Sequence, residues 1–330
     1  MKKIPALLLA LFMLVGVFAG GGKQPDAAKT GKLKVVATIF PAYDWVLEIL
    51  GDKADNAEVT FLLDNGVELH SYQPTAEDIV KISTCDLFIY VGGESDRLVD
   101  TALKNTAGKK RKVLKLLEAL GDAVKTEKTV EGMQEPAHDP ANFDSREHPK
   151  APEYDEHVWL SLKNAAILVK AVCESLQALD PDNADVYAAN GEAYMKKLSA
   201  LDGEYRKAVD GATGKTLLFG DRFPFRYMAE DYGLRYYAAF AGCSAETEAG
   251  FETISFLAKK ADELKLPCVL TIEGSQHKIA QAVVQATAEK NQTVLTMNSM
   301  QSTTSKDLKA GTTYLSVMEK NLSVLKEALR

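Results

Sequence analysis

The chain has 330 residues, of which 46% are hydrophobic and 26% charged, and its formal net charge is −7 at pH 7. An acidic chain without a basic cluster interleaved with aromatic residues excludes nucleic acid as an expected partner. Its length exceeds the usual size of one compact core, so we expect two lobes of about 150 residues each. We also expect the protein to be a monomer.

Residues 1–22 have the pattern of a signal peptide. Lys2 and Lys3 precede an apolar run over residues 4–19, which small residues close. This run is shorter than the roughly 18 to 20 apolar residues of a membrane-spanning helix. Residues 23–32 are expected to form a flexible tether. We therefore expect export to the periplasm or the cell surface.

The four cysteines lie far apart, without any Cys-x-x-Cys spacing. They are Cys85, Cys173, Cys243 and Cys268. This spacing excludes zinc ribbons and thioredoxin-like motifs, and it favours buried, hydrophobic thiols. The sequence leaves open whether any of them pair as disulfides after export. Bacterial lipoprotein signals carry a cysteine where this chain has Gly21, so a lipid anchor is not predicted but stays open.

Residues 33–181 alternate between short β-branched runs and segments with helical apolar spacing. The expected strands and helices cover residues 33–39, 43–50, 58–63, 75–82, 87–91, 95–104 and 113–116. This alternation is typical of βα units around a parallel sheet. Residues 131–156, with four prolines, many acids, His138 and His148, are expected to form a surface loop. That loop is either a solvated insertion or a region that captures metal loosely.

Residues 182–211 are expected to form one long helix with apolar residues at three- and four-residue spacings. It would span on the order of 40 Å and connect the two lobes. Residues 212–330 resume the βα alternation and form the second lobe. The predicted fold is therefore α/β, with two Rossmann-like lobes, parallel sheets and one bridging helix.

Two motifs carry the chemistry. Residues 65–78 contain His70, and residues 155–161 contain His157. Each motif places one histidine at a strand-to-loop junction beside carboxylates and aromatics, which is how proteins present an oriented imidazole to a metal ion. Together they predict a metal-binding cleft.

The sequence resembles the zinc- and manganese-binding solute-binding proteins of bacterial ABC importers over essentially its whole length after the signal. The matching stretches are Gly66–Asp78, Asp86–Gly93, Asp155–Ser161, Asp180–Pro181 with Tyr187 and Asn190, and Tyr314–Leu315 with Met318, Asn321 and Leu322. The resemblance implies a metal cleft between the lobes and an ABC permease as partner. It also implies His70 and His157 as ligands, with Glu68 and Asp155 orienting their rings.

The second lobe departs from the family pattern. The resemblance places Arg222 where a third ligand is expected, and Asn298 where some members carry an aspartate. A guanidinium cannot coordinate a cation, so Asp221 and His277 are the candidate replacements. Glu273 is expected either to support the site or to pair with Arg222.

Three functions follow from these residues. The leading one is capture of Zn²⁺, with Mn²⁺ as the alternative ion, for delivery to a membrane permease. A metallohydrolase is disfavoured because the chain lacks His-Glu-x-x-His and Gly-x-Ser-x-Gly, so we expect no enzyme. The third is a receptor for an anionic metal chelate bound by Arg222 and Arg226.

Overall fold

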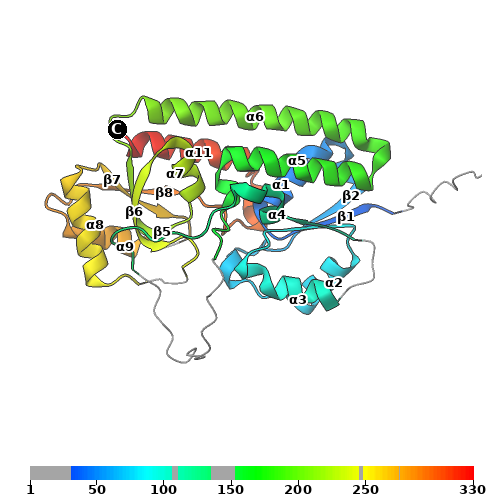
Figure 1. Ribbon diagram of the computed structural model, residues 1–330, viewed down its shortest axis with the longest axis horizontal. Coiled ribbons are helices and arrows are strands. Elements are labelled where there is room, and N and C mark those ends of the chain that lie inside the picture. The colour runs from blue at the N-terminus through cyan, green and yellow to red at the C-terminus, as the bar shows by residue number, and fades with distance from the viewer. Residues whose placement is uncertain (1–30, 106–110, 135–152, 245–247, 275) are drawn as a thin grey trace, which may run out of the picture. The chain divides into compact units, whose positions relative to one another are not determined.

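The computed structural model describes residues 31–105, 111–134, 153–244, 248–274 and 276–330. The predicted signal peptide, nearly all of the tether, and most of the 131–156 loop with both of its histidines lie outside these residues. Residues Leu33–Arg330 form one unit, which holds two parallel sheets (Figure 1).

The first sheet has the strand order β2-β1-β3-β4, and all its pairs are parallel. Its strands are β1 (Leu33–Ala37), β2 (Ala57–Phe61), β3 (Leu87–Tyr90) and β4 (Lys112–Lys115). The continuous apolar run of β3 is buried throughout, as expected for a strand covered on both faces. The accompanying helices are α1 (Phe40–Leu50), α2 (Ala76–Thr84), α3 (Arg97–Asn105) and α4 (Leu116–Leu120).

The second sheet is also parallel and has the order β6-β5-β7-β8. Its strands are β5 (Thr216–Phe223), β6 (Arg235–Ala241), β7 (Cys268–Ile272) and β8 (Thr293–Met297). Strand β5 runs further than predicted, and its register against β6 shifts between Phe219 and Arg222. Asp221 and Arg222 therefore lie in an irregular strand end and not in a following loop.

The helices of the second half are α7 (Arg226–Tyr232), α8 (Phe251–Glu263), α9 (Lys278–Ala286), α10 (Ser305–Lys309) and α11 (Tyr314–Ala328). Local signals start several helices of the chain. Thr75 and Asp78 form a reciprocal capping box at α2, and Thr313 and Ser316 form one at α11.

The bridging helix α6 (Ala184–Asp210) has 27 residues, so it is about 40 Å long. It packs against α1 and α5 (Leu162–Leu179) at one end and against α11, which itself covers β8, at the other. Sequence analysis did not predict α5, the helix that follows the second histidine motif. The predicted architecture of two parallel α/β lobes and a long helix is confirmed.

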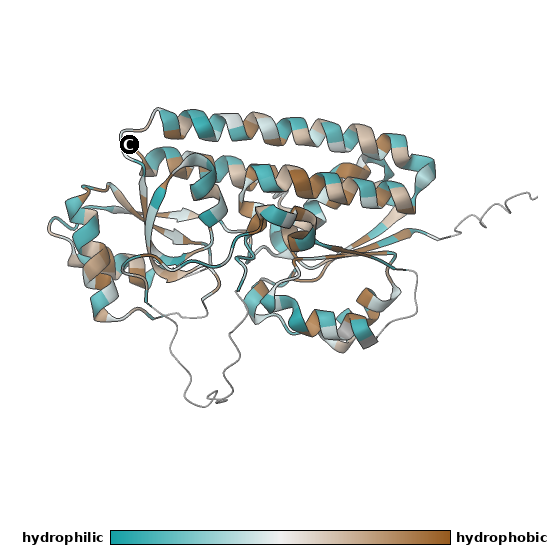
Figure 2. Ribbon diagram, in the orientation of Figure 1, coloured by the Kyte–Doolittle hydropathy of each residue, from teal (hydrophilic) through white to brown (hydrophobic). Residues whose placement is uncertain are grey.

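One hydrophobic core continues through both lobes. It contains Trp45 and Trp159 of the first lobe and Phe219 and Tyr314 of the second. The rings of Trp45 and Tyr314 lie 5.3 Å apart, edge to face, and both are fully buried. Figure 2 shows the hydrophobic residues concentrated in the sheets and in α5, while α6 is more polar. A smaller cluster lies between the second sheet and helices α8 and α9.

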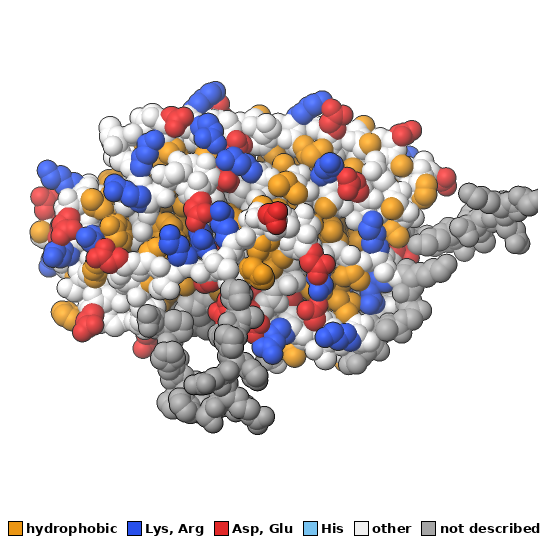
Figure 3. Space-filling view, viewed as in Figure 1, with side chains coloured by type: hydrophobic (Ala, Val, Ile, Leu, Met, Phe, Trp, Pro, Cys, Tyr) orange, Lys and Arg blue, Asp and Glu red, His pale blue; other side chains and the backbone are white. Residues whose placement is uncertain are grey.

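Within the described residues, no helix is both long enough and apolar enough to cross a membrane. Acidic and basic side chains alternate over the face of the molecule drawn in Figure 3. All four cysteines lie in the described part of the chain and are free thiols.

Candidate metal centre

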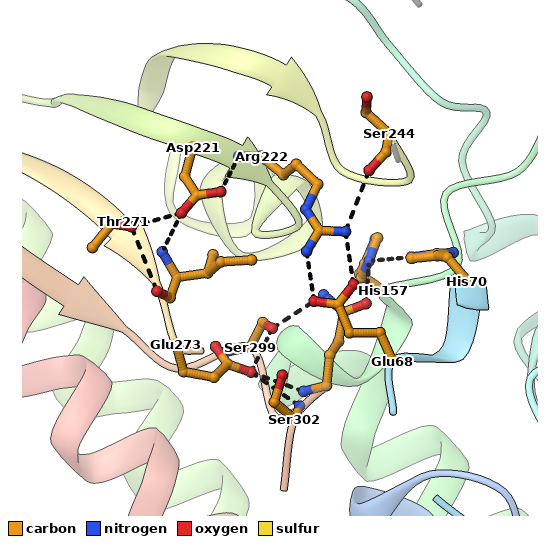
Figure 4. A network of polar contacts seen from close by, with 12 residues as sticks. Glu68, His70, His157, Asp221, Arg222, Ser244, Thr271, Glu273, Ser299 and Ser302 are labelled. Carbon is orange, nitrogen blue, oxygen red and sulfur yellow. Dashed lines mark hydrogen bonds and ion pairs between the residues drawn. The ribbon is translucent and has the colours of Figure 1, made fainter. Parts of the chain in front are cut away.

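Two histidines from separate segments of the first lobe meet (Figure 4). His70 lies in the short 3-10 helix Leu69–Ser71, after the loop that leaves β2, and His157 directly precedes the 3-10 helix Val158–Leu160. Their Nε2 atoms are 3.2 Å apart. The side chain of His157 is fully buried, and that of His70 is 8% exposed. The fold therefore brings the two predicted ligands together at a position that is largely buried from solvent.

The other ring nitrogen of each histidine faces an oxygen. Nδ1 of His157 lies 2.9 Å from Oδ1 of Asp155. Nδ1 of His70 lies 2.7 Å from Oγ of Ser95 and 3.7 Å from Oε2 of Glu156. An acceptor at Nδ1 selects the tautomer whose lone pair is on Nε2. With this tautomer on each ring, the two Nε2 lone pairs converge on one position, which suits a proton or a metal ion.

The electrostatics of the pair favour a single proton. Burial lowers the pKa of His70 to about 3, and His157 and Arg222 add to this shift. Burial also lowers the pKa of His157, but Cys243 and Asp155 outweigh it and hold that pKa well above its usual value. A proton shared between the two Nε2 atoms therefore favours His157 over His70. A divalent ion bound by both rings would replace this proton.

An amide oxygen reaches the same position from the second lobe. Oε1 of Gln301 lies 3.3 Å from Nε2 of His157. The carboxylate of Glu273 accepts hydrogen bonds from the backbone N–H groups of Ser299 and Gln301 at 2.6 and 2.9 Å. Nε1 of Trp159 donates to the carbonyl oxygen of Ser299 at 2.9 Å. Glu273 of the second lobe and Trp159 of the first lobe thus both hold the loop that carries Gln301.

Cys243 places a thiol beside the two histidines. Its Sγ and a ring nitrogen of each of His70 and His157 all lie within 4.8 Å of one another. The same thiol forms a second group, within the same limit, with the carboxylates of Glu127 and Asp155. Burial raises the pKa of the Cys243 thiol to about 11, although the neighbouring His157 opposes this shift.

Arg222 connects the two lobes next to this cluster. Its Nη1 and Nη2 donate to the carboxylate of Glu68 at 2.9 and 2.5 Å, and Nη1 also donates to the carbonyl oxygen of Ser244 at 3.3 Å (Figure 4). Glu68, predicted to orient His70, is therefore engaged with Arg222 instead. Pairing with Arg222 was one of the two roles predicted for Glu273, but Arg222 pairs with Glu68.

Asp221 and His277 lie apart from the histidine pair. The carboxylate of Asp221 accepts a hydrogen bond from Oγ1 of Thr271 at 2.6 Å, and Nδ1 of His277 lies 3.1 Å from the same hydroxyl. Both residues line a pocket of about 520 Å³ whose wall includes Arg222. Neither belongs to the groups of metal-binding side chains found among the described residues. This arrangement gives no support to their predicted role as ligands, which zinc titration of variants can test.

Asn298 has a local structural role. Its Oδ1 accepts the Met300 N–H at 2.7 Å, and its own N–H donates to Oδ1 of Asn321 at 2.8 Å. Sequence reasoning thus singled out Asn298 and missed Gln301, three residues later. It also treated Cys243 as a core residue, although a turn after a parallel strand faces the ligand crevice and could have drawn attention to it.

Comparison with known proteins identifies relatives along nearly the whole chain. The family described as zinc-uptake complex component A, periplasmic, matches residues 35–328. The zinc-binding lipoprotein AdcA of Streptococcus pneumoniae serotype 4 is 33% identical over 327 residues, which cover 99% of this chain and 61% of that protein. The high-affinity zinc uptake system protein ZnuA of Bacillus subtilis is 28% identical over 98% of this chain and 96% of its own length.

The fold agrees with these relationships. The crystal structure of Zn(II)-bound AdcA from Streptococcus pneumoniae matches 91% of this chain and 58% of its own, with a TM-score of 0.70 and 30% identity. This chain spans about 61% of the length of AdcA. The match over residues 35–328 is nevertheless continuous through both lobes, and the chain belongs to the family of zinc-uptake complex component A, periplasmic.

Proposed function

We propose that this chain captures a zinc ion between His70 and His157 and is the substrate-binding component of a metal ABC importer. The observation that carries the proposal is the 3.2 Å separation of the two Nε2 atoms. Tetrahedral zinc with Zn–N bonds of about 2.0–2.1 Å holds its nitrogen ligands roughly 3.3 Å apart. The rings therefore need little movement to bind the ion.

The relatives support zinc as the cargo. AdcA is described as a zinc-binding lipoprotein and ZnuA as part of a high-affinity zinc uptake system. By analogy, we propose that this chain is exported and hands its ion to a membrane permease. We also propose that it acts by binding alone, because two oriented imidazoles in a buried position favour retention of an ion over turnover of a substrate.

The hydrophobic core that the two lobes share limits how the ion can be released. Because α6 packs on helices of both halves and the core is continuous, wide opening of the lobes would expose much apolar surface. We propose lobes at residues 33–181 and 212–330, joined by the helix at 182–211, with release through movement of the loops that carry the ligands.

The contacts of Arg222 give no support to the anionic-chelate alternative. The guanidinium already donates to Glu68 and to the carbonyl oxygen of Ser244, so a chelate would have to displace both partners. Manganese differs from zinc in preferring oxygen ligands, whereas the converging atoms at this site are mainly nitrogen.

The test is a calorimetric titration of the chelator-stripped full chain with Zn²⁺ and, separately, with Mn²⁺. We expect one zinc ion per chain, bound more tightly than manganese. Tighter manganese binding, or no saturable zinc site, would contradict the proposal.

A further inference from the structure

We infer that Cys243 supplies a thiolate ligand to the ion held by His70 and His157, which makes the site selective for zinc over manganese. This inference rests on the proposed zinc capture and identifies the residue that replaces the ligand missing at Arg222. Its starting observation is that Sγ of Cys243 and one ring nitrogen of each of His70 and His157 lie within 4.8 Å of one another.

The distances suit a common ion. A zinc ion with Zn–N bonds of about 2.0–2.1 Å and a Zn–S bond of about 2.3 Å separates nitrogen from sulfur by roughly 3.6 Å. From a separation of 4.8 Å, the upper limit for this group, a change of about 1 Å in the position of Sγ brings the thiol near this distance.

The turn that carries Cys243 is fixed on both sides. The N–H of Gly242 donates to Oε1 of Glu127 at 2.8 Å, and the carbonyl oxygen of Ser244 accepts from Nη1 of Arg222 at 3.3 Å. Cys243 is therefore held between two anchored neighbours, like the ligands of preorganised sites. Arg222 cannot bind the ion, but it positions the residue that can.

Gly242 lets this turn approach His157. A Cβ atom at position 242 would lie 3.1 Å from both Cε1 and Nδ1 of the imidazole and 2.9 Å from the carbonyl oxygen of Phe223. Any larger residue would push the turn away from the ring. The close approach of the Gly242 backbone to His157 thus places the next side chain, Cys243, beside this imidazole.

The chemistry follows from the ligand types. When zinc binds, the S–H bond of Cys243 breaks, the proton leaves to solvent, and the sulfur lone pair forms the Zn–S bond. Thiolate and imidazole favour zinc, while manganese prefers carboxylate, carbonyl and water oxygens. The amide oxygen of Gln301, 3.3 Å from Nε2 of His157, is placed to complete four-coordination.

The test uses Co²⁺ as a spectroscopic substitute for zinc in the chelator-stripped full chain. A thiolate ligand gives an intense sulfur-to-cobalt charge-transfer band in the near ultraviolet, which imidazole and oxygen ligands do not give. We expect this band in the unaltered protein, and we expect added Zn²⁺ to abolish it.

Two variants make the test specific. Cys243→Ser should bind cobalt without the band and should lose at least about 10-fold in zinc affinity, with less effect on manganese. Cys85→Ser, which alters a buried thiol in the first lobe, should keep the band. Cobalt binding without the band in the unaltered protein, or a band that survives in Cys243→Ser, would overturn the role of Cys243 but leave zinc capture standing. A complete lack of cobalt and zinc binding would overturn both.

Discussion

His157 and His70 approach each other through their Nε2 atoms at 3.2 Å, while Nδ1 of each ring is directed at a separate oxygen acceptor. Because the Nδ1 side of each ring is held by its own partner, the two Nε2 atoms converge. The contact lies where the two histidine motifs of the first lobe meet Gln301 of the second lobe.

Removal of either imidazole should nearly abolish zinc capture. Because loss of an orienting partner alone commonly costs about 10- to 100-fold in metal affinity, His70→Ala and His157→Ala should each cost at least about 100-fold. Competition with a chromophoric chelator measures this loss. Circular dichroism should show that both variants remain folded.

The matched control is a histidine outside the cluster. His277 contacts Thr271 and does not belong to the metal-binding groups of the described residues, so His277→Ala should change zinc affinity less than about 3-fold. A loss comparable to that of His70→Ala would instead return His277 to the ligand set.

Arg222→Ala should lower both stability and zinc affinity. The side chains of Arg222 and Glu68 are only 14% and 23% exposed, so removal of the guanidinium leaves a partly buried carboxylate without its main partner. We expect the free energy of unfolding to fall by about 1–3 kcal/mol, measured by urea denaturation. Arg97→Ala, which breaks an exposed pair with Glu94, should change it by less than about 1 kcal/mol.

Two glycine substitutions should act in opposite directions. Gly242→Ala should weaken zinc binding and stability, because the added Cβ meets the His157 ring and the Phe223 carbonyl. Gly203→Ala should raise the free energy of unfolding by about 0.5–1 kcal/mol, since Gly203 lies within α6 and a Cβ there meets nothing within 4 Å. Thermal unfolding of the two metal-free variants distinguishes these effects, and equal shifts would contradict the argument.

Asp44 should make stability fall as the pH rises. Burial raises its pKa to about 7, although the N–H of Tyr314 opposes this shift. Between the unfolded value of 3.8 and about 7, the unfolded chain loses a proton that the folded chain keeps, so the free energy of unfolding decreases across this window. Asp44→Asn keeps the acceptor for Tyr314. Between pH 4 and pH 7, its free energy of unfolding should fall by at least about 1.4 kcal/mol less than that of the unaltered protein. Parallel curves for the two proteins would contradict this assignment.

The fold was predictable because its signals are local and repeated. Continuous apolar runs such as β3 and the helical spacing of α6 specify buried strands and a long helix without reference to distant residues. Helix α5 escaped prediction, although Ser161 caps it by accepting the N–H of Asn164. The cap at Ser161 marks where α5 begins, but the apolar residues of this segment did not reveal its start.

The candidate site was only half predictable. His70 and His157 lie in motifs whose neighbouring residues point to metal chemistry, whereas Cys243 and Gln301 lie in turns of ordinary composition. What places Cys243 is a set of contacts over long sequence separations, from Gly242 to Glu127 and from Arg222 to Ser244 and Glu68. Such contacts depend on the assembled fold, and no local pattern encodes them.

The most direct test of zinc capture is a crystal structure of the zinc-loaded full chain with anomalous data collected at the zinc edge. We predict one zinc ion about 2.0–2.1 Å from Nε2 of both His70 and His157. An ion bound elsewhere, for example by Asp221 and His277 in the neighbouring pocket, or no ordered zinc after loading, would contradict it.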